Sequence, residues 1–170
     1  MKLEQYIRDV PDFPIPGILF RDITPLLRDP QALASAVEAM TAPWRGRRVD
    51  LVAAMEARGF VFGAAMAVEL DAGFVPFRKE GKLPWRTRSI DYALEYREEI
   101  LHVHEDAVQP GQKVLVVDDL IATGGTAAAV VDLVEQLGGE VVGAQFLVEL
   151  SDLAGRKLLA RREVHSVIVY

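Results

Sequence analysis

Several residue types and patterns that define whole classes of protein are missing from this sequence. Cysteine does not occur among the 170 residues, which excludes a disulfide framework and zinc sites built from thiolates. The apolar runs, such as residues 51–55 and 114–117, are far shorter than the roughly 20 residues that cross a bilayer. Residues 1–10 carry four charged side chains, so they lack the apolar core of a signal peptide. We therefore expect a cytoplasmic protein without a membrane partner.

An excess of basic residues is also missing. Lys and Arg number 19 against 25 Asp and Glu, which gives a net charge of −6. Nonspecific nucleic-acid binding normally needs a basic surface, so we expect no nucleic-acid partner. One local exception is the segment 78–88, where five basic residues accompany a single acid, Glu80. Such a segment can focus a positive field on a small phosphorylated molecule.

Asparagine is the other absent residue type, and 14 of the 19 basic residues are arginine. Depletion of thermolabile residues is a feature of heat-adapted proteins. A GC-rich genome also favours Arg, Ala and Gly. The composition leaves both interpretations open.

The pattern of the chain predicts a single domain, residues 1–170, of the α/β class. Strand-like apolar runs alternate with helical periodicity, which indicates a mostly parallel twisted sheet with helices on both faces. Asp29 is placed to cap a helix that ends at Thr41. The expected helices are residues 3–10, 30–41, 60–70, 126–137 and 151–160, and the expected strands are residues 49–55, 74–77, 113–118, 141–150 and 165–170.

Residues 85–108 break this alternation. They are polar, charged and aromatic, and we expect a flexible hairpin that covers a site. His102 and His104 alternate within this segment and so should face the same side of a strand. Two histidines without further ligands do not make a metal site, so we assign no metal ligands to the protein.

The chemistry is concentrated in the segment Val114-Leu-Val-Val-Asp-Asp-Leu-Ile-Ala-Thr-Gly-Gly-Thr126. A buried strand leads to two carboxylates, Asp118 and Asp119, at the edge of the sheet where ligands bind in parallel α/β folds. The small residues 122–126 then open a helix, and their N–H groups suit a phosphate. Adjacent carboxylates suit the two hydroxyls of a ribose. The alternative is that one Asp caps the helix and the glycines only turn the chain.

This segment resembles the phosphoribosyl pyrophosphate motif of the type I phosphoribosyltransferases. Further segments resemble the adenine phosphoribosyltransferase family in its order. They are Phe13-Pro-Ile-Pro-Gly-Ile-Leu-Phe-Arg-Asp-Ile-Thr-Pro25, Glu56-Ala-Arg-Gly-Phe-Val-Phe-Gly63, Arg78-Lys-Glu-Gly-Lys-Leu-Pro84 and Tyr92-Ala-Leu-Glu-Tyr96. The resemblance implies the type I fold, with a flap at about residues 85–108 and a small N-terminal hood segment.

The resemblance also implies a role for each matching residue. The 5′-phosphate is held by Ala122, Thr123, Gly124, Gly125 and Thr126, and the ribose diol by Asp118 and Asp119. The pyrophosphate is held by Ala57, Arg58, Gly59, Lys79 and Lys82, with a cis peptide expected between Glu56 and Ala57. Adenine is bound by Leu19, Phe20 and Arg21, and the catalytic residues are Glu95, Tyr96 and Arg58.

Alternatives remain for several of these residues. Phe20 could belong to the core, Lys79 and Lys82 could be surface lysines, and Glu95 could be a solvated acid. The implied reaction joins adenine to phosphoribosyl pyrophosphate to give AMP and pyrophosphate, with Mg²⁺ held mainly by the substrate, in a homodimer. The alternatives are a phosphoribosyltransferase for another purine such as xanthine, and a regulator that only senses phosphoribosyl pyrophosphate.

Overall fold

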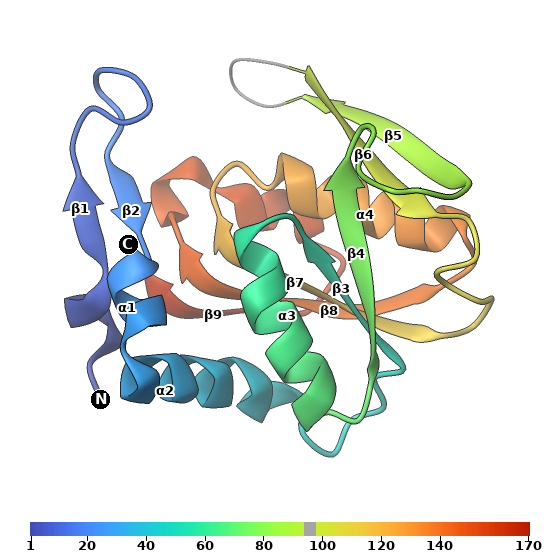
Figure 1. Ribbon diagram of the computed structural model, residues 1–170, viewed down its shortest axis with the longest axis horizontal. Helices are drawn as coiled ribbons and strands as arrows, with labels where there is room; N and C mark the ends of the chain where they lie inside the picture. The colour runs from blue at the N-terminus through green and yellow to red at the C-terminus, as the bar shows by residue number, and fades with distance from the viewer. Residues whose placement is uncertain (94–97) are drawn as a thin grey trace. The chain divides into compact units, whose positions relative to one another are not determined.

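The computed structural model of this protein describes residues 1–93 and 98–170 (Figure 1). The chain forms two compact units, Met1–Ala39 and Met40–Tyr170. None of the helices in the described ranges combines the length and the apolar character that a membrane crossing requires. The second unit contains the sheet that the alternating pattern predicts.

The first unit is built on a small antiparallel hairpin. After the 3-10 helix η1 (Leu3–Tyr6), β1 (Arg8–Val10) pairs with β2 (Phe20–Asp22). The helix expected over residues 3–10 is therefore wrong in its second half. The backbone of β1 takes its hydrogen bonds from a strand further along the chain, and local propensity does not reveal such a partner.

Two helices follow the hairpin, α1 (Thr24–Arg28) and α2 (Pro30–Thr41). The Asp29 carboxylate accepts hydrogen bonds from the N–H groups of Gln31 at 3.0 Å and Ala32 at 2.8 Å. These are donors that the first turn of a helix leaves without a partner. The predicted cap and the predicted end at Thr41 are both confirmed.

The second unit is a seven-stranded sheet in the order β5-β6-β4-β3-β7-β8-β9. The pairs β4–β3, β3–β7, β7–β8 and β8–β9 are parallel, as predicted. The strands are β3 (Leu51–Met55), β4 (Gly73–Lys79), β5 (Thr87–Ala93), β6 (Glu98–His104), β7 (Lys113–Ile121), β8 (Glu140–Glu149) and β9 (Val164–Val169). The helices are η2 (Ala42–Trp44), α3 (Arg58–Glu69), α4 (Gly125–Gln136), η3 (Ser151–Leu153) and η4 (Gly155–Leu159).

Helices cover both faces of the central strands. Successive residues of β3 point to opposite faces, so each helix layer contacts a different set of β3 side chains. On one face, a Cβ added at Gly63 of α3 would lie 2.6 Å from the Ala54 Cβ, so this helix packs tightly on β3. On the other face, Ala53 belongs to the same buried cluster as Val130 and Val134 of α4. The predicted α/β architecture is confirmed.

The segment that breaks the alternation forms an antiparallel hairpin of β5 and β6, as predicted. Strand β6 also pairs with β4, at Arg78↔His102 and Lys79↔Leu101, so the hairpin extends the sheet (Figure 1). Nδ1 of His102 lies 3.2 Å from the Thr87 hydroxyl. Glu95 and Tyr96 lie outside the described residues.

One expected helix, residues 151–160, is replaced by two 3-10 helices, η3 and η4. Ala154 separates them with a φ of 53°, in the left-handed region. A residue in that conformation interrupts a right-handed helix, so the continuous helix cannot form. This interruption places Gly155 against the loop that follows β7.

Candidate active site

The site lies at the carboxyl edge of the parallel strands. Strands β3 and β7 are neighbours and run in the same direction, so the turn after β3 and the loop after β7 meet there. Two adjoining cavities occupy this edge. One, of about 410 Å³, is lined by Met55, Glu56, Ala57, Arg58, Lys79, Tyr92, Glu99, Leu101, Asp118, Asp119 and Thr126. The other, of about 210 Å³, is lined by Arg58 and residues 118–127.

Residues 122–126, which we call the glycine loop, connect β7 to α4. Gly124 has a φ of +84° and is the residue before the first turn of α4. This left-handed conformation suits glycine, which has no Cβ. The smaller cavity therefore lies at the N-terminus of a twelve-residue helix, where N–H groups without helical partners favour an anion.

Asp118 and Asp119 lie within the last four residues of β7, which ends at Ile121, and line both cavities. Burial raises the pKa of the Asp118 carboxyl well above its usual range, and the charge of Asp119 raises it further. Asp119 is 5% exposed, and its Oδ2 accepts a hydrogen bond of 2.6 Å from Nε of Arg58. The structure thus brings together two acids and an arginine that the sequence separates.

Gly59, in the first turn of α3, allows this close approach. A Cβ added there would lie 2.6 Å from Oδ1 of Asp118. Only a residue without a side chain leaves the Asp118 carboxylate in its position.

The turn at residues 56–59 has the cis peptide bond between Glu56 and Ala57 that the sequence resemblance implies. The Glu56 carboxylate accepts a hydrogen bond of 2.6 Å from the N–H of Lys79 and lies 3.4 Å from the Arg78 guanidinium. This turn is thereby tied to the end of β4. Ala57 and Arg58, two of the residues predicted to hold the pyrophosphate, line the larger cavity.

The two predicted lysines differ in position. Lys79 lines the larger cavity, and its Nζ lies 3.2 Å from Oε1 of Glu99. The hydroxyl of Tyr92 donates to the other oxygen of Glu99 at 2.9 Å. Lys82 is exposed in the turn after β4, and neither cavity includes it among the described residues that line them.

The three residues predicted to bind adenine belong to the first unit. Phe20 packs edge-to-face on Phe13, with ring centroids 5.1 Å apart. Val10, Phe13, Phe20 and Asp22 line a cavity of about 250 Å³. Leu19 is exposed, and the Arg21 guanidinium pairs with Asp9. Phe20 therefore has a partly open ring beside a cavity within this unit, which suits a stacking surface.

Sequence reasoning missed several residues of this region. Glu56, Tyr92 and Glu99 line the larger cavity without an assigned role, although Glu56 and Tyr92 stand in segments that carry the family resemblance. Gly155 lies against the backbone of the glycine loop. An isolated glycine inside an expected helix was the one signal that pointed to it.

Comparison with known proteins agrees with this fold and shows the family. The model of the phosphoribosyl transferase domain matches residues 29–166. The chain belongs to the phosphoribosyltransferase family.

The individual relatives are more specific. The chain is 57% identical to the adenine phosphoribosyltransferase of Symbiobacterium thermophilum and 58% identical to that of Thermotoga neapolitana, and both alignments cover all of both proteins. The crystal structure of the Rhodothermus marinus adenine phosphoribosyltransferase is 52% identical, with a TM-score of 0.94 over 99% of this chain and 96% of that one. The family predicted from the sequence is confirmed.

Proposed function

We propose that this enzyme transfers the 5-phosphoribosyl group from phosphoribosyl pyrophosphate to N9 of adenine, giving AMP and pyrophosphate in purine salvage. The proposal rests on one observation: the glycine loop, two adjacent acids and the 56–59 turn meet around two adjoining cavities at one edge of the sheet. Support also comes from relatives over the full chain that are adenine phosphoribosyltransferases. The yeast adenine phosphoribosyltransferase, 36% identical with a TM-score of 0.91 over 98% of this chain and 96% of that one, has a structure complexed with adenine.

The parts of the substrate map onto the site by charge and hydrogen-bonding capacity. The 5′-phosphate fits the glycine loop, where N–H groups and the hydroxyls of Thr123 and Thr126 can donate. The ribose diol fits the carboxylates of Asp118 and Asp119. The pyrophosphate fits the larger cavity beside Ala57 and Arg58, with Lys79 at its wall. Gly59 follows them in the first turn of α3. Lys82 would have to approach from the exposed turn after β4.

The reaction breaks the bond between C1′ and the pyrophosphate oxygen and forms the bond from C1′ to N9 of adenine. Charge develops on the leaving pyrophosphate, so positioned cations stabilise the transition state. Arg58 is held by Asp119 in the free protein. When a ribose diol donates to Asp119, the guanidinium is released to the pyrophosphate side of the cavity. Substrate binding and stabilisation of the leaving group are linked in this way.

Magnesium fits this site as a partner of the substrate. The carboxylates of Asp118 and Asp119 are oxygen ligands of the kind Mg²⁺ accepts. The described ranges contain no group of three or more His, Cys, Asp or Glu side chains arranged for a metal. Such a site suits an ion held mainly by substrate phosphates, one or two carboxylates and water. When bound, the ion supplies positive charge to the pyrophosphate oxygens.

Adenine would stack on Phe20, with backbone groups of Leu19 and Arg21 reading its edge. A backbone carbonyl that accepts from the 6-amino group faces an oxygen in a 6-oxopurine, which can give discrimination on the order of 10⁴. In the flap, Glu95 would handle the N9 proton and Tyr96 would help to shield the reaction from water. The proposal further includes a single functional domain over residues 1–170, a homodimer and a cytoplasmic location.

A base panel tests this proposal. The protein is incubated with phosphoribosyl pyrophosphate, Mg²⁺ and one of adenine, guanine, hypoxanthine or xanthine, and nucleotide formation is measured. We expect AMP formation to exceed every other product by at least about 10³-fold. Preference for xanthine would favour the other-purine alternative. Binding of phosphoribosyl pyrophosphate without any product would favour the regulator.

A further inference from the structure

The glycine loop is in direct backbone contact with a segment from the far end of the chain. A Cβ added at Gly155 would lie 2.2 Å from the carbonyl oxygen of Ala122 and 2.7 Å from the nitrogen of Gly124. Conversely, a Cβ added at Gly124 would lie 2.4 Å from the carbonyl oxygen of Gly155. Neither position has room for a side chain, so the backbone of the loop packs directly on the backbone of Gly155.

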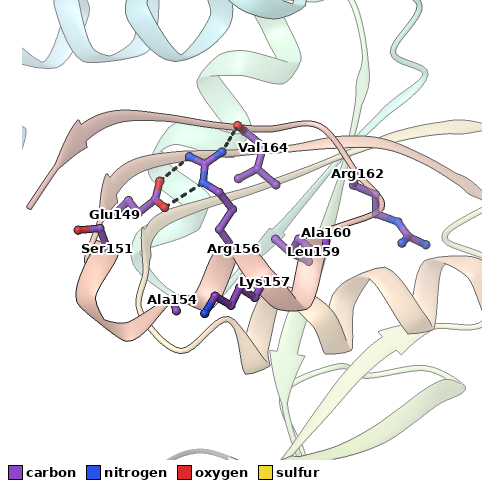
Figure 2. A pocket seen from close by; sticks show the side chains of 9 residues that line it. All are labelled: Glu149, Ser151, Ala154, Arg156, Lys157, Leu159, Ala160, Arg162 and Val164. Atoms are coloured by element: carbon purple, nitrogen blue, oxygen red, sulfur yellow. Dashed lines mark hydrogen bonds and ion pairs between the residues drawn. The ribbon is translucent and has the colours of Figure 1, made fainter.

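The residue after Gly155 fixes this segment to the sheet. Arg156 donates to Glu149 through Nε to Oε1 at 2.9 Å and through Nη2 to Oε2 at 2.5 Å. Its Nη1 donates to the carbonyl oxygen of Val164 at 2.6 Å. Figure 2 shows the guanidinium between the Glu149 carboxylate and the Val164 backbone, on the wall of a cavity of about 460 Å³. A bidentate pair of this kind fixes geometry as well as charge.

Glu149, the residue to which Arg156 is bound, lies beside the residue that precedes the glycine loop. Glu149 is 7% exposed and is in register with Ile121, the last residue of β7. The N–H of Leu150 donates to the carbonyl of Ile121 at 3.0 Å. The hydrogen bond from Arg156 lowers the pKa of the Glu149 carboxyl, so this acid stays ionised near neutral pH. The ion pair therefore connects the residue after Gly155 to the end of β8, which pairs with the end of β7.

We propose that Gly155 and the Arg156–Glu149 ion pair are positioning residues of the phosphate site. None of these three residues lines either cavity of the site, and they act by holding residues 122–124 in place at the smaller cavity. The inference rests on the proposed function of the glycine loop. A displacement of about 1 Å in such a loop can cost on the order of a hundredfold in rate.

Gly155→Ala is the direct test. We expect the KM for phosphoribosyl pyrophosphate and the dissociation constant for AMP, measured by calorimetry, each to rise about tenfold or more. The KM for adenine should change less than about threefold. Gly143→Ala is the matched control, because its Cβ would lie 2.2 Å from the Trp44 ring, away from the loop. This control should lower stability without a selective effect on phosphoribosyl pyrophosphate.

A second variant keeps the test decisive if Gly155→Ala does not fold. Arg156→Met removes the ion pair with similar side-chain length, and Arg156→Lys restores the charge but not the bidentate geometry. We expect the dissociation constant for AMP to rise several-fold in Arg156→Met and less in Arg156→Lys. Lys157→Met changes an exposed cation of the same cavity and should leave AMP binding unchanged.

The outcomes separate this inference from the function on which it rests. Wild-type protein without activity in the base panel would overturn the proposed function. Active wild-type protein, with variants that melt earlier but bind AMP and phosphoribosyl pyrophosphate as the wild type does, would overturn the positioning role alone. If Gly155→Ala and Gly143→Ala each raised the KM for phosphoribosyl pyrophosphate and the KM for adenine by the same factor, this result would also count against the positioning role.

Discussion

Nε of Arg58 donates a 2.6 Å hydrogen bond to Oδ2 of Asp119, although the two residues are 61 positions apart in the sequence. Asp119 is nearly buried, whereas about half of the Arg58 side chain is exposed. The arginine therefore offsets the charge of an acid that burial would otherwise disfavour. The same contact links the turn after β3 to the end of β7, and most of the predicted chemistry depends on these two segments.

The diol assignment predicts the effect of neutralising both acids. Asp118→Asn with Asp119→Asn should raise the KM for phosphoribosyl pyrophosphate tenfold or more, because hydrogen bonds to charged groups contribute roughly 1.5–3 kcal/mol each. Steady-state kinetics provides the measurement. Asp132→Asn, an exposed acid on α4, serves as the control. An unchanged KM in a folded double variant would refute the assignment.

Gly59→Ala should act through Asp118. The added methyl group would lie 2.6 Å from Oδ1, so the carboxylate must move out of its position. We expect the KM for phosphoribosyl pyrophosphate to rise about tenfold. On an Asp118→Ala background the same substitution should have little further effect, since contacting residues are not additive. Full additivity in this double-mutant cycle would show that Gly59 acts elsewhere.

Phe20→Ala tests the adenine site. Stacking of a base on an aromatic side chain contributes roughly 1–3 kcal/mol, so the KM for adenine should rise by about tenfold or more. The KM for phosphoribosyl pyrophosphate should stay nearly constant. Thermal melting is measured alongside. A large fall in melting temperature, or an equal rise in both KM values, would assign Phe20 to the core.

The flap hypothesis concerns Glu95, which lies outside the described residues. If its carboxylate handles the N9 proton, Glu95→Gln should lower kcat at least tenfold, because a general acid or base contributes typically 10²–10⁴-fold. Substrate KM values should hardly change. Glu105→Gln, an exposed acid in the turn after β6, is the matched control. Near-normal turnover in Glu95→Gln would leave Glu95 as a solvated acid.

The Arg156–Glu149 ion pair predicts a pH dependence of stability. Its hydrogen bonds lower the pKa of Glu149 below the ordinary 4.5, so the folded state binds the proton less readily than the unfolded state. The stabilisation is therefore present above pH 4.5 and is lost as the pH falls through the folded-state value. Melting temperatures of wild type and Glu149→Gln should differ at pH 7 and converge in acid. A constant difference down to pH 3 would contradict this role.

The local patterns determined the parts of the protein that short segments specify. The run Val114–Val117, the paired acids and the glycine loop were predicted as strand, carboxylates and helix N-terminus, and the structure has them in that order. Asp29 was predicted as a cap because a cap needs only its own helix. The 56–59 turn and its cis peptide came from resemblance to the family.

Only the tertiary structure decided the contacts between distant segments. The pairing of β1 with β2 replaced half of an expected helix, and Ala154 split another into η3 and η4. The Arg58–Asp119 pair and the contact of Gly155 with the glycine loop follow from strand order and register, which place remote residues at one edge of the sheet. Backbone propensity acts within a few residues, whereas these contacts depend on how whole strands are paired, and that information is not local.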